Sequence, residues 1–195
     1  MHYKGFCLFF LLTALFSCQD NNEKRLAENK KEAKRQEVIF NSINKNWDFY
    51  NEPINEVSLA TTSSWNEWRQ FLDELGEKPK KSISAFQKKS TAIVNKALVL
   101  PATIPLQFST PAIKSRLSVL ITKIQMMDLY IHLDKIPDEK VALMITDINK
   151  DLVSLQRQMD KIVEVSKIPK EEGESELMQM LNDTTRAIPD TPTIQ

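Results

Sequence analysis

The sequence predicts an all-α fold, an antiparallel helical bundle built around one long, heptad-patterned helical hairpin. Two runs of apolar residues keep alternating spacings of four and three residues, which is typical of helices that pack along a common seam. The first run is Ile113, Leu117, Leu120, Ile124, Met127 and Ile131, and the second is Val141, Ile145, Ile148, Leu152, Leu155, Met159 and Ile162. Because only a short link containing Pro137 separates them, the two helices should fold back on each other. The one stretch rich in β-forming residues, 99–108, contains two prolines, which argue against a strand.

The N-terminus has the organisation of an export signal. Lys4 precedes an apolar run from Phe6 to Phe16. This run is shorter than the roughly 20 apolar residues that a membrane-spanning helix needs. A basic residue followed by a short apolar run is typical of a secretory signal peptide. We therefore expect the chain to be exported.

The end of the apolar run, Leu15-Phe16-Ser17-Cys18, resembles the lipobox of bacterial lipoproteins. In that class the cysteine thiol is acylated and the cysteine becomes the first residue of the mature chain. The resemblance implies a signal peptide over residues 1–17 and lipid attachment, including palmitate, at Cys18. Several acyl chains would give the durable anchoring that a single chain does not. An ordinary secretory signal that contains Cys18 is the alternative.

Residues 19–23, directly after the cysteine, are all acids or amides, and none is apolar. They resemble the acid-rich export signals that follow the cysteine in surface lipoproteins of the Bacteroidota. No aspartate directly follows Cys18, so the inner-membrane retention signal of enteric bacteria is missing. Together these resemblances imply a lipid-anchored protein of the bacterial outer membrane and cell envelope, facing either the cell surface or the periplasm.

Residues 18–37 form the predicted polar tether or stalk. Residues 23–37 are almost wholly charged, yet apolar or aromatic residues recur every seven positions at Leu26, Ala33, Phe40 and Trp47. This repeat predicts a helix that begins as an exposed stalk and is buried later. Several like charges stand four residues apart and weaken an isolated helix. A flexible tether is therefore the alternative.

Residues 38–188 form the predicted helical bundle domain. A helix is expected from Ser64, where Ser64 and Glu67 fit a capping box, to Gly76. Another is expected from about Lys81 to Leu98. The next stretch, LVLPATIPLQFSTP, contains three prolines, so we expect an extended path across apolar surface.

The two helices of the hairpin follow, and their start is well marked. Thr110 followed by Pro111 fits the first positions of a helix. After the second helix, an amphipathic segment over 175–188 completes the domain, and residues 189–195 form a proline-containing tail.

Composition excludes several classes of function. Once the leader is removed and Cys18 is acylated, the mature chain keeps no free thiol, a single histidine and two distant glycines. Zinc sites and glycine-rich phosphate loops cannot be built from this inventory. The formal net charge is zero with both signs interspersed, which argues against nucleic acid as a partner. We expect no cofactor and no metal.

Two groups of residues are candidate sites. Asp128 and His132 stand four residues apart on one helix face, which suits acid–base chemistry or a structural pair at a helix end. Without a second histidine or a nucleophile, the structural interpretation is favoured. The aromatic residues form the second group and either make a binding surface or fill the core; they are Trp47, Phe49, Tyr50, Trp65 and Trp68.

The expected function is that of a non-catalytic, membrane-anchored lipoprotein that binds or scaffolds another envelope component, either a protein or a polysaccharide. One alternative is a carrier or sensor that holds a small apolar ligand between helices. A hydrolase that uses carboxylates alone is the other. Helical carboxylate enzymes place Glu-x-x-His on facing helices. Because Leu129 stands three residues before His132, this motif is absent.

Overall fold

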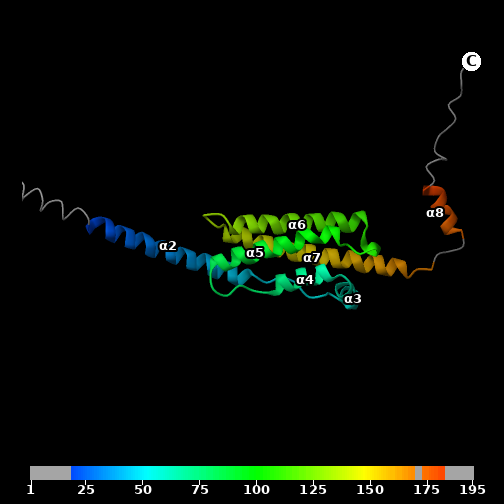
Figure 1. Cartoon of the computed structure of the whole chain (residues 1–195), viewed down its shortest axis with the longest axis horizontal. Helices are drawn as coiled ribbons and strands as arrows, with labels where there is room; N and C mark the ends of the chain where they lie inside the picture. The colour runs from blue at the N-terminus through cyan, green and yellow to red at the C-terminus, as the bar shows by residue number, and fades with distance from the viewer. Residues whose placement is uncertain (1–18, 170–172, 183–195) are drawn as a thin grey trace, which may run out of the picture.

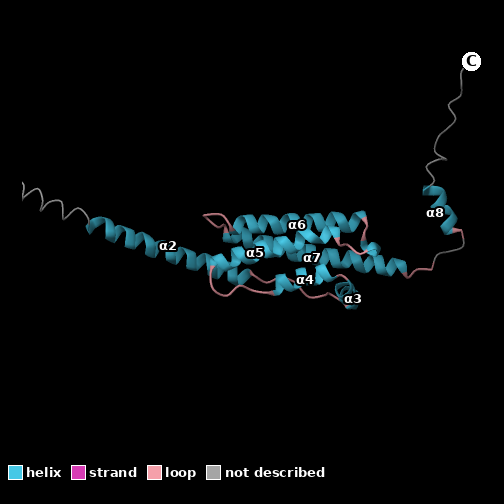
Figure 2. Cartoon of the chain, viewed as in Figure 1, coloured by secondary structure: helices cyan, strands magenta, loops and turns pink. Residues whose placement is uncertain are grey.

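Helices make up nearly all the regular structure in residues 19–169 and 173–182, which are the residues that the computed structural model describes (Figure 2). The α-helices are α2 (Gln19–Asn46), α3 (Glu56–Ser64), α4 (Asn66–Gly76), α5 (Ile83–Val99), α6 (Pro111–Ile131), α7 (Asp138–Ser166) and α8 (Glu174–Asn182). Two 3₁₀ turns, η1 (Leu100–Ala102) and η2 (Leu106–Phe108), join α5 to α6. The described residues contain no strand, so the predicted all-α fold is confirmed.

Some predictions concern parts of the chain outside the described residues. These are the signal peptide over 1–17, the acylated Cys18, the end of the last amphipathic segment beyond Asn182 and the tail over 189–195.

α6 and α7 pack along each other through most of the body, and α6 lies along its upper edge in Figure 1. Every apolar residue that the spacing assigned to the seam of α6 is buried, and so is every such residue of α7 except the partly buried Ile162. α5 packs on α6, α4 packs on α5, and both α3 and the end of α2 pack on α7. The body therefore consists of six packed helices, α2 to α7.

Side-chain caps mark the beginnings of three of these helices, α3, α5 and α6. The Thr110 side chain accepts a hydrogen bond from the Ile113 backbone N–H at 3.4 Å, with Pro111 in the first turn, as the sequence predicted. The Ser82 side chain caps α5 by accepting from the Ala85 N–H at 3.2 Å. Each cap satisfies a backbone donor that has no partner within the helix.

The predicted capping box at Ser64 is wrong. Ser64 is the last residue of α3, and its hydroxyl donates to the Thr61 carbonyl at 2.9 Å, so it cannot cap the next helix. The N-cap position of α4 is Trp65, which makes no side-chain cap bond. α3 itself was not predicted, because its buried residues are hydroxyl-bearing and not apolar.

The proline-rich link between α5 and α6 is also more compact than predicted. It turns twice as short 3₁₀ helices where an extended path was expected. Leu100 and Phe108 are buried as expected, but Leu106 is 94% exposed and does not lie on the body.

α2 is one continuous helix in the described residues, so the stalk is helical. Its side chains over 22–34 are all exposed, and its first buried residue is Ile39. In Figure 1 this helix projects from one end of the body. Further along, Phe40 packs against Phe86, with their ring centroids 5.6 Å apart. None of the helices in the described part of the chain is long and apolar enough to cross a membrane.

Candidate functional site

Four of the five aromatic candidates lie in the core. Trp47, Phe49, Trp65 and Trp68 are buried, whereas Tyr50 is 56% exposed. The structure therefore places the group largely in the second of its two predicted roles, as core. Only Tyr50 presents its ring at the surface.

The buried tryptophans tie separate segments of the body together. The Trp47 ring packs against Phe49 and against Phe86 of α5, with centroids 5.3 and 4.9 Å away. The Trp65 ring stacks on Trp68 at 5.6 Å, and its indole N–H donates to the Thr103 hydroxyl at 3.0 Å. These contacts join the residue that follows α2 to α5, and the junction of α3 and α4 to the link between α5 and α6.

Asp128 and His132 meet, but as part of the packing between α5 and α6. The Asp128 Oδ1 accepts hydrogen bonds from the Ser90 and Thr91 hydroxyls of α5 at 2.6 and 3.1 Å. His132 is the C-cap of α6, and its Nδ1 lies 2.8 Å from the Asp128 carbonyl and 3.3 Å from Oδ1. The carboxylate is occupied by helix-to-helix bonds, which favours the structural interpretation.

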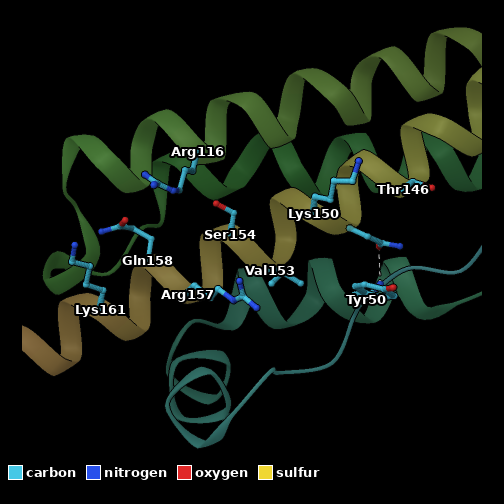
Figure 3. Close-up of a pocket in the computed structure, with 10 residues that line it drawn as sticks. Tyr50, Arg116, Thr146, Lys150, Val153, Ser154, Arg157, Gln158 and Lys161 are labelled. Atoms are coloured by element: carbon cyan, nitrogen blue, oxygen red, sulfur yellow. Dashed lines mark hydrogen bonds between the residues drawn. The ribbon is translucent and has the colours of Figure 1, made fainter.

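A groove of about 650 Å³ runs along the outer face of α7, and we call it the α7 groove (Figure 3). Its cations are Arg116, Lys150, Arg157 and Lys161. Its uncharged polar residues are Thr146, Asn149, Ser154 and Gln158, and Tyr50 and Val153 complete the lining. Arg116 comes from α6 on one side, and Tyr50 lies on the segment between α2 and α3 on the other.

The helical repeat explains why these side chains gather. Eight of the lining residues lie between 146 and 161 on α7 at spacings of one, three and four, which place them on one outward stripe. The apolar seam of α7 occupies the opposite, inward face. The sequence that builds the hairpin core therefore also presents a polar stripe to solvent.

Asn149 fixes the other wall of the groove. Its Oδ1 accepts from the Tyr50 backbone N–H at 2.9 Å, drawn as the dashed line in Figure 3. Its Nδ2 donates to the Asp48 carbonyl at 2.8 Å. Two turns further on, the Gln156 Oε1 accepts from the Ile54 N–H at 3.1 Å. These bonds hold the irregular segment between α2 and α3 against α7, and with it Tyr50.

Asp160 completes this row of buried polar residues on α7. Its two carboxylate oxygens accept from the Asn55 side-chain amide at 2.6 Å and from the Ser58 hydroxyl at 3.1 Å. Asn55 in turn caps α3 through the Ser58 N–H at 2.8 Å. The carboxylate thus points towards α3 and away from the α7 groove.

The other nearby carboxylates are also occupied. Asp147 pairs with Lys150 at 2.7 Å, and this hydrogen bond and the positive charge lower the pKa of Asp147. Asp151 pairs with Lys123 of α6 at 2.7 Å. Within the described part of the chain no ion pair reaches Arg116, Arg157 or Lys161.

The α7 groove therefore presents four cations and several hydrogen-bonding groups, and Val153 is its single aliphatic lining residue. Arginine and lysine bind carboxylate and phosphate through strong, charge-assisted hydrogen bonds. Across residues 19–169 and 173–182 no group of three or more histidine, cysteine or acidic side chains could hold a metal ion. The arrangement suits binding of an anion.

Sequence analysis missed the α7 groove for a physical reason. Lys150, Arg157 and Lys161 alternate in the sequence with aspartates, so local net charge hides them. Asp151 binds Lys123 of α6 and Asp160 binds Ser58 of α3, so neither of these aspartates neutralises the cations of the outward stripe. The signal in the sequence is the helical repeat, because these cations all fall at positions of α7 that face away from its apolar seam.

Comparison with protein-family models, with curated proteins and with solved structures gives no match to this chain.

Proposed function

We propose that the chain is a lipid-anchored, non-catalytic envelope lipoprotein that binds or scaffolds another component of the bacterial envelope. In this proposal Cys18 carries the acyl chains, and the helical body is the binding module. The protein resides in the outer membrane and faces the periplasm or the cell surface.

The exposed stalk is the observation that carries the proposal. The first buried residue, Ile39, comes 21 positions after Cys18, which in a helix corresponds to about 30 Å. A highly charged helix of this length stabilises no core and binds no neighbouring helix over its first half. It serves as a spacer between an anchor and a body that works away from the bilayer.

The α7 groove supports binding as the role of the body. It has a volume of about 650 Å³ and is lined by cations and uncharged polar groups, with Tyr50 and Val153. An apolar ligand held here would lie against four cationic side chains and could satisfy none of their hydrogen-bond donors, so this groove does not favour the alternative of an apolar carrier.

Acylation of Cys18 provides the test. In cells fed labelled palmitate, the Cys18→Ala variant should take up no label, because the acyl acceptor is absent. Cys7→Ala is the matched control, because it removes the other cysteine from within the leader and should leave labelling intact. Label retained by the Cys18→Ala variant would contradict the proposal. Release of the protein without substitutions from membranes by an alkaline wash would contradict it too.

A further inference from the structure

We infer that the α7 groove binds an anionic saccharide, that is, a sugar chain bearing carboxylate or phosphate groups. This inference rests on the proposed binding function and names the class of ligand. Four observations carry it: unneutralised cations, their spacing, the polar lining and the exposed ring of Tyr50.

Three of the four cations of the α7 groove form no ion pair within the described residues, whereas Lys150 pairs with Asp147. Arg157 and Lys161 form no ion pair with any described residue, and the neighbouring Asp151 and Asp160 bind α6 and α3 instead. Arg116 is half-buried and donates only to the Ala112 carbonyl at 3.2 Å. Arginine has five donors, so most of its capacity is available to a ligand.

The spacing of the cations indicates an extended ligand. Lys150, Arg157 and Lys161 stand at intervals of seven and four residues on α7, which spreads their charges over about 16 Å. One small ion cannot contact all of them. A chain with several anionic groups can.

The uncharged lining favours a saccharide over an acidic peptide. Thr146, Ser154 and Gln158 offer hydroxyl and amide groups that match sugar hydroxyls, and Val153 is the single aliphatic residue. A peptide helix that docks in a groove needs a row of apolar anchors, which this lining does not provide.

Tyr50 supplies an aromatic surface for the sugar. Its ring is exposed, while its backbone is held by Asn149. A ring fixed in this way loses little freedom on binding, which favours affinity. The apolar C–H face of a pyranose can stack on such a ring while its anionic group meets the cations.

The stalk argues against the headgroups of the anchoring bilayer as the ligand. A helix of about 30 Å separates Cys18 from the body. With the stalk upright, the phosphates of that bilayer lie out of reach of the α7 groove. A polymer that extends from the envelope surface can reach the α7 groove.

The test is calorimetric titration of the full-length protein, purified in detergent, with polymers of known charge. The probes are polygalacturonate and phosphorylated mannan as anionic saccharides, dextran as a neutral one, poly-L-glutamate as an acidic peptide, and inorganic phosphate. We expect at least one anionic saccharide to bind, dextran to give no heat, and affinity to fall at high salt because salt screens the cations.

Paired variants locate the site. Arg157→Gln with Lys161→Gln should weaken saccharide binding by about tenfold, because it removes two charge-assisted contacts. The control changes the same amount of charge on the stalk, Lys30→Gln with Lys31→Gln, and should bind as the unchanged protein does. All four residues are exposed, so melting temperatures should not change. Tyr50→Ala should weaken binding and Tyr50→Phe should preserve it.

Several results would overturn the inference. These are failure of both anionic saccharides to bind, binding of poly-L-glutamate as tight as that of the saccharides, full competition by inorganic phosphate, and equal affinity of the groove and stalk variants. The outcome is independent of the anchor test. Loss of saccharide binding leaves palmitate labelling unchanged, and loss of labelling leaves the α7 groove intact.

Discussion

The stalk in α2 and the hairpin of α6 and α7 both repeat apolar residues every seven positions, yet only the hairpin is buried along its length. In α2, Leu26 and Ala33 are exposed and Phe40 is half-buried, and Trp47, directly after the helix, is buried. In the hairpin the seam residues of both helices are buried, save for the partly buried Ile162.

The difference lies in how many apolar residues each heptad supplies. The stalk has one per seven residues, which leaves gaps of two helical turns, whereas the hairpin has two at alternating spacings of four and three. Two per heptad make a continuous stripe that a partner helix can cover. A period alone therefore predicts a helix, and the density of apolar residues predicts its burial.

The largest effect should come from placing a charge in the seam. Leu152→Asp puts a carboxylate at a fully buried position of α7 and should cost several kcal/mol of stability or prevent folding. Leu26→Asp is the matched control on the exposed stalk and should change stability by less than about 0.5 kcal/mol. Thermal unfolding followed by circular dichroism compares the two, and equal melting temperatures would contradict the contrast.

An intermediate effect should come from the polar row on the same helix. Asp160→Ala leaves the Asn55 amide and the buried Ser58 hydroxyl without their acceptor, which should cost about 1–3 kcal/mol. Denaturant unfolding measures the loss. Asp147→Ala, which removes an aspartate from the exposed side of α7, should have a much smaller effect. If the Asp147 variant proved the less stable of the two, the polar row would not hold the segment between α2 and α3.

The smallest effect concerns an ion-pair cluster between α4 and α5. The Lys89 ammonium lies 2.7 Å from both Glu74 and Glu77, and its side chain is 10% exposed. Burial lowers the pKa of Lys89, but hydrogen bonds and charge from Glu74 and Glu77 outweigh burial and raise it. The hydrogen bond and charge of Lys89 lower the pKa of Glu77. Lys89→Met should therefore cost about 1 kcal/mol at neutral pH, mainly through Glu74.

The pH dependence of this cost has a definite sign. The raised pKa of Lys89 means that its contribution is complete below the ordinary lysine value of 10.5 and is lost as pH rises through the raised value. The lowered pKa of Glu77 means that its contribution is present above 4.5 and is lost as pH falls through the lowered value. Stability of the two proteins, measured across pH, should converge at both extremes. A constant difference would show that the cluster does not contribute through charge.

Burial along the hairpin could be predicted because it depends on a pattern within each helix. The start of α6 could be predicted for the same reason, since Thr110 and Pro111 act locally. α3 could not, because its burial depends on Asp160, which lies about a hundred positions away. The charge of the α7 groove also depends on distant residues, because Asp151 pairs with Lys123 and Asp160 binds Ser58. Core packing likewise decided the placement of Trp65 and Trp68.

The continuous helix from Gln19 has a further consequence for how the body is presented. Each residue of an α-helix advances about 1.5 Å and turns about 100°. Removing one residue from the exposed part of α2 would therefore swing the whole body, and the direction in which the α7 groove opens, by more than a quarter of a circle. Removing seven would bring the body about 10 Å closer to the start of α2 and leave its rotation about the helix axis almost unchanged. The length of the helix thus sets both the distance of the body from the start of α2 and the rotation of the body about the helix axis, which a flexible linker of the same composition could not do.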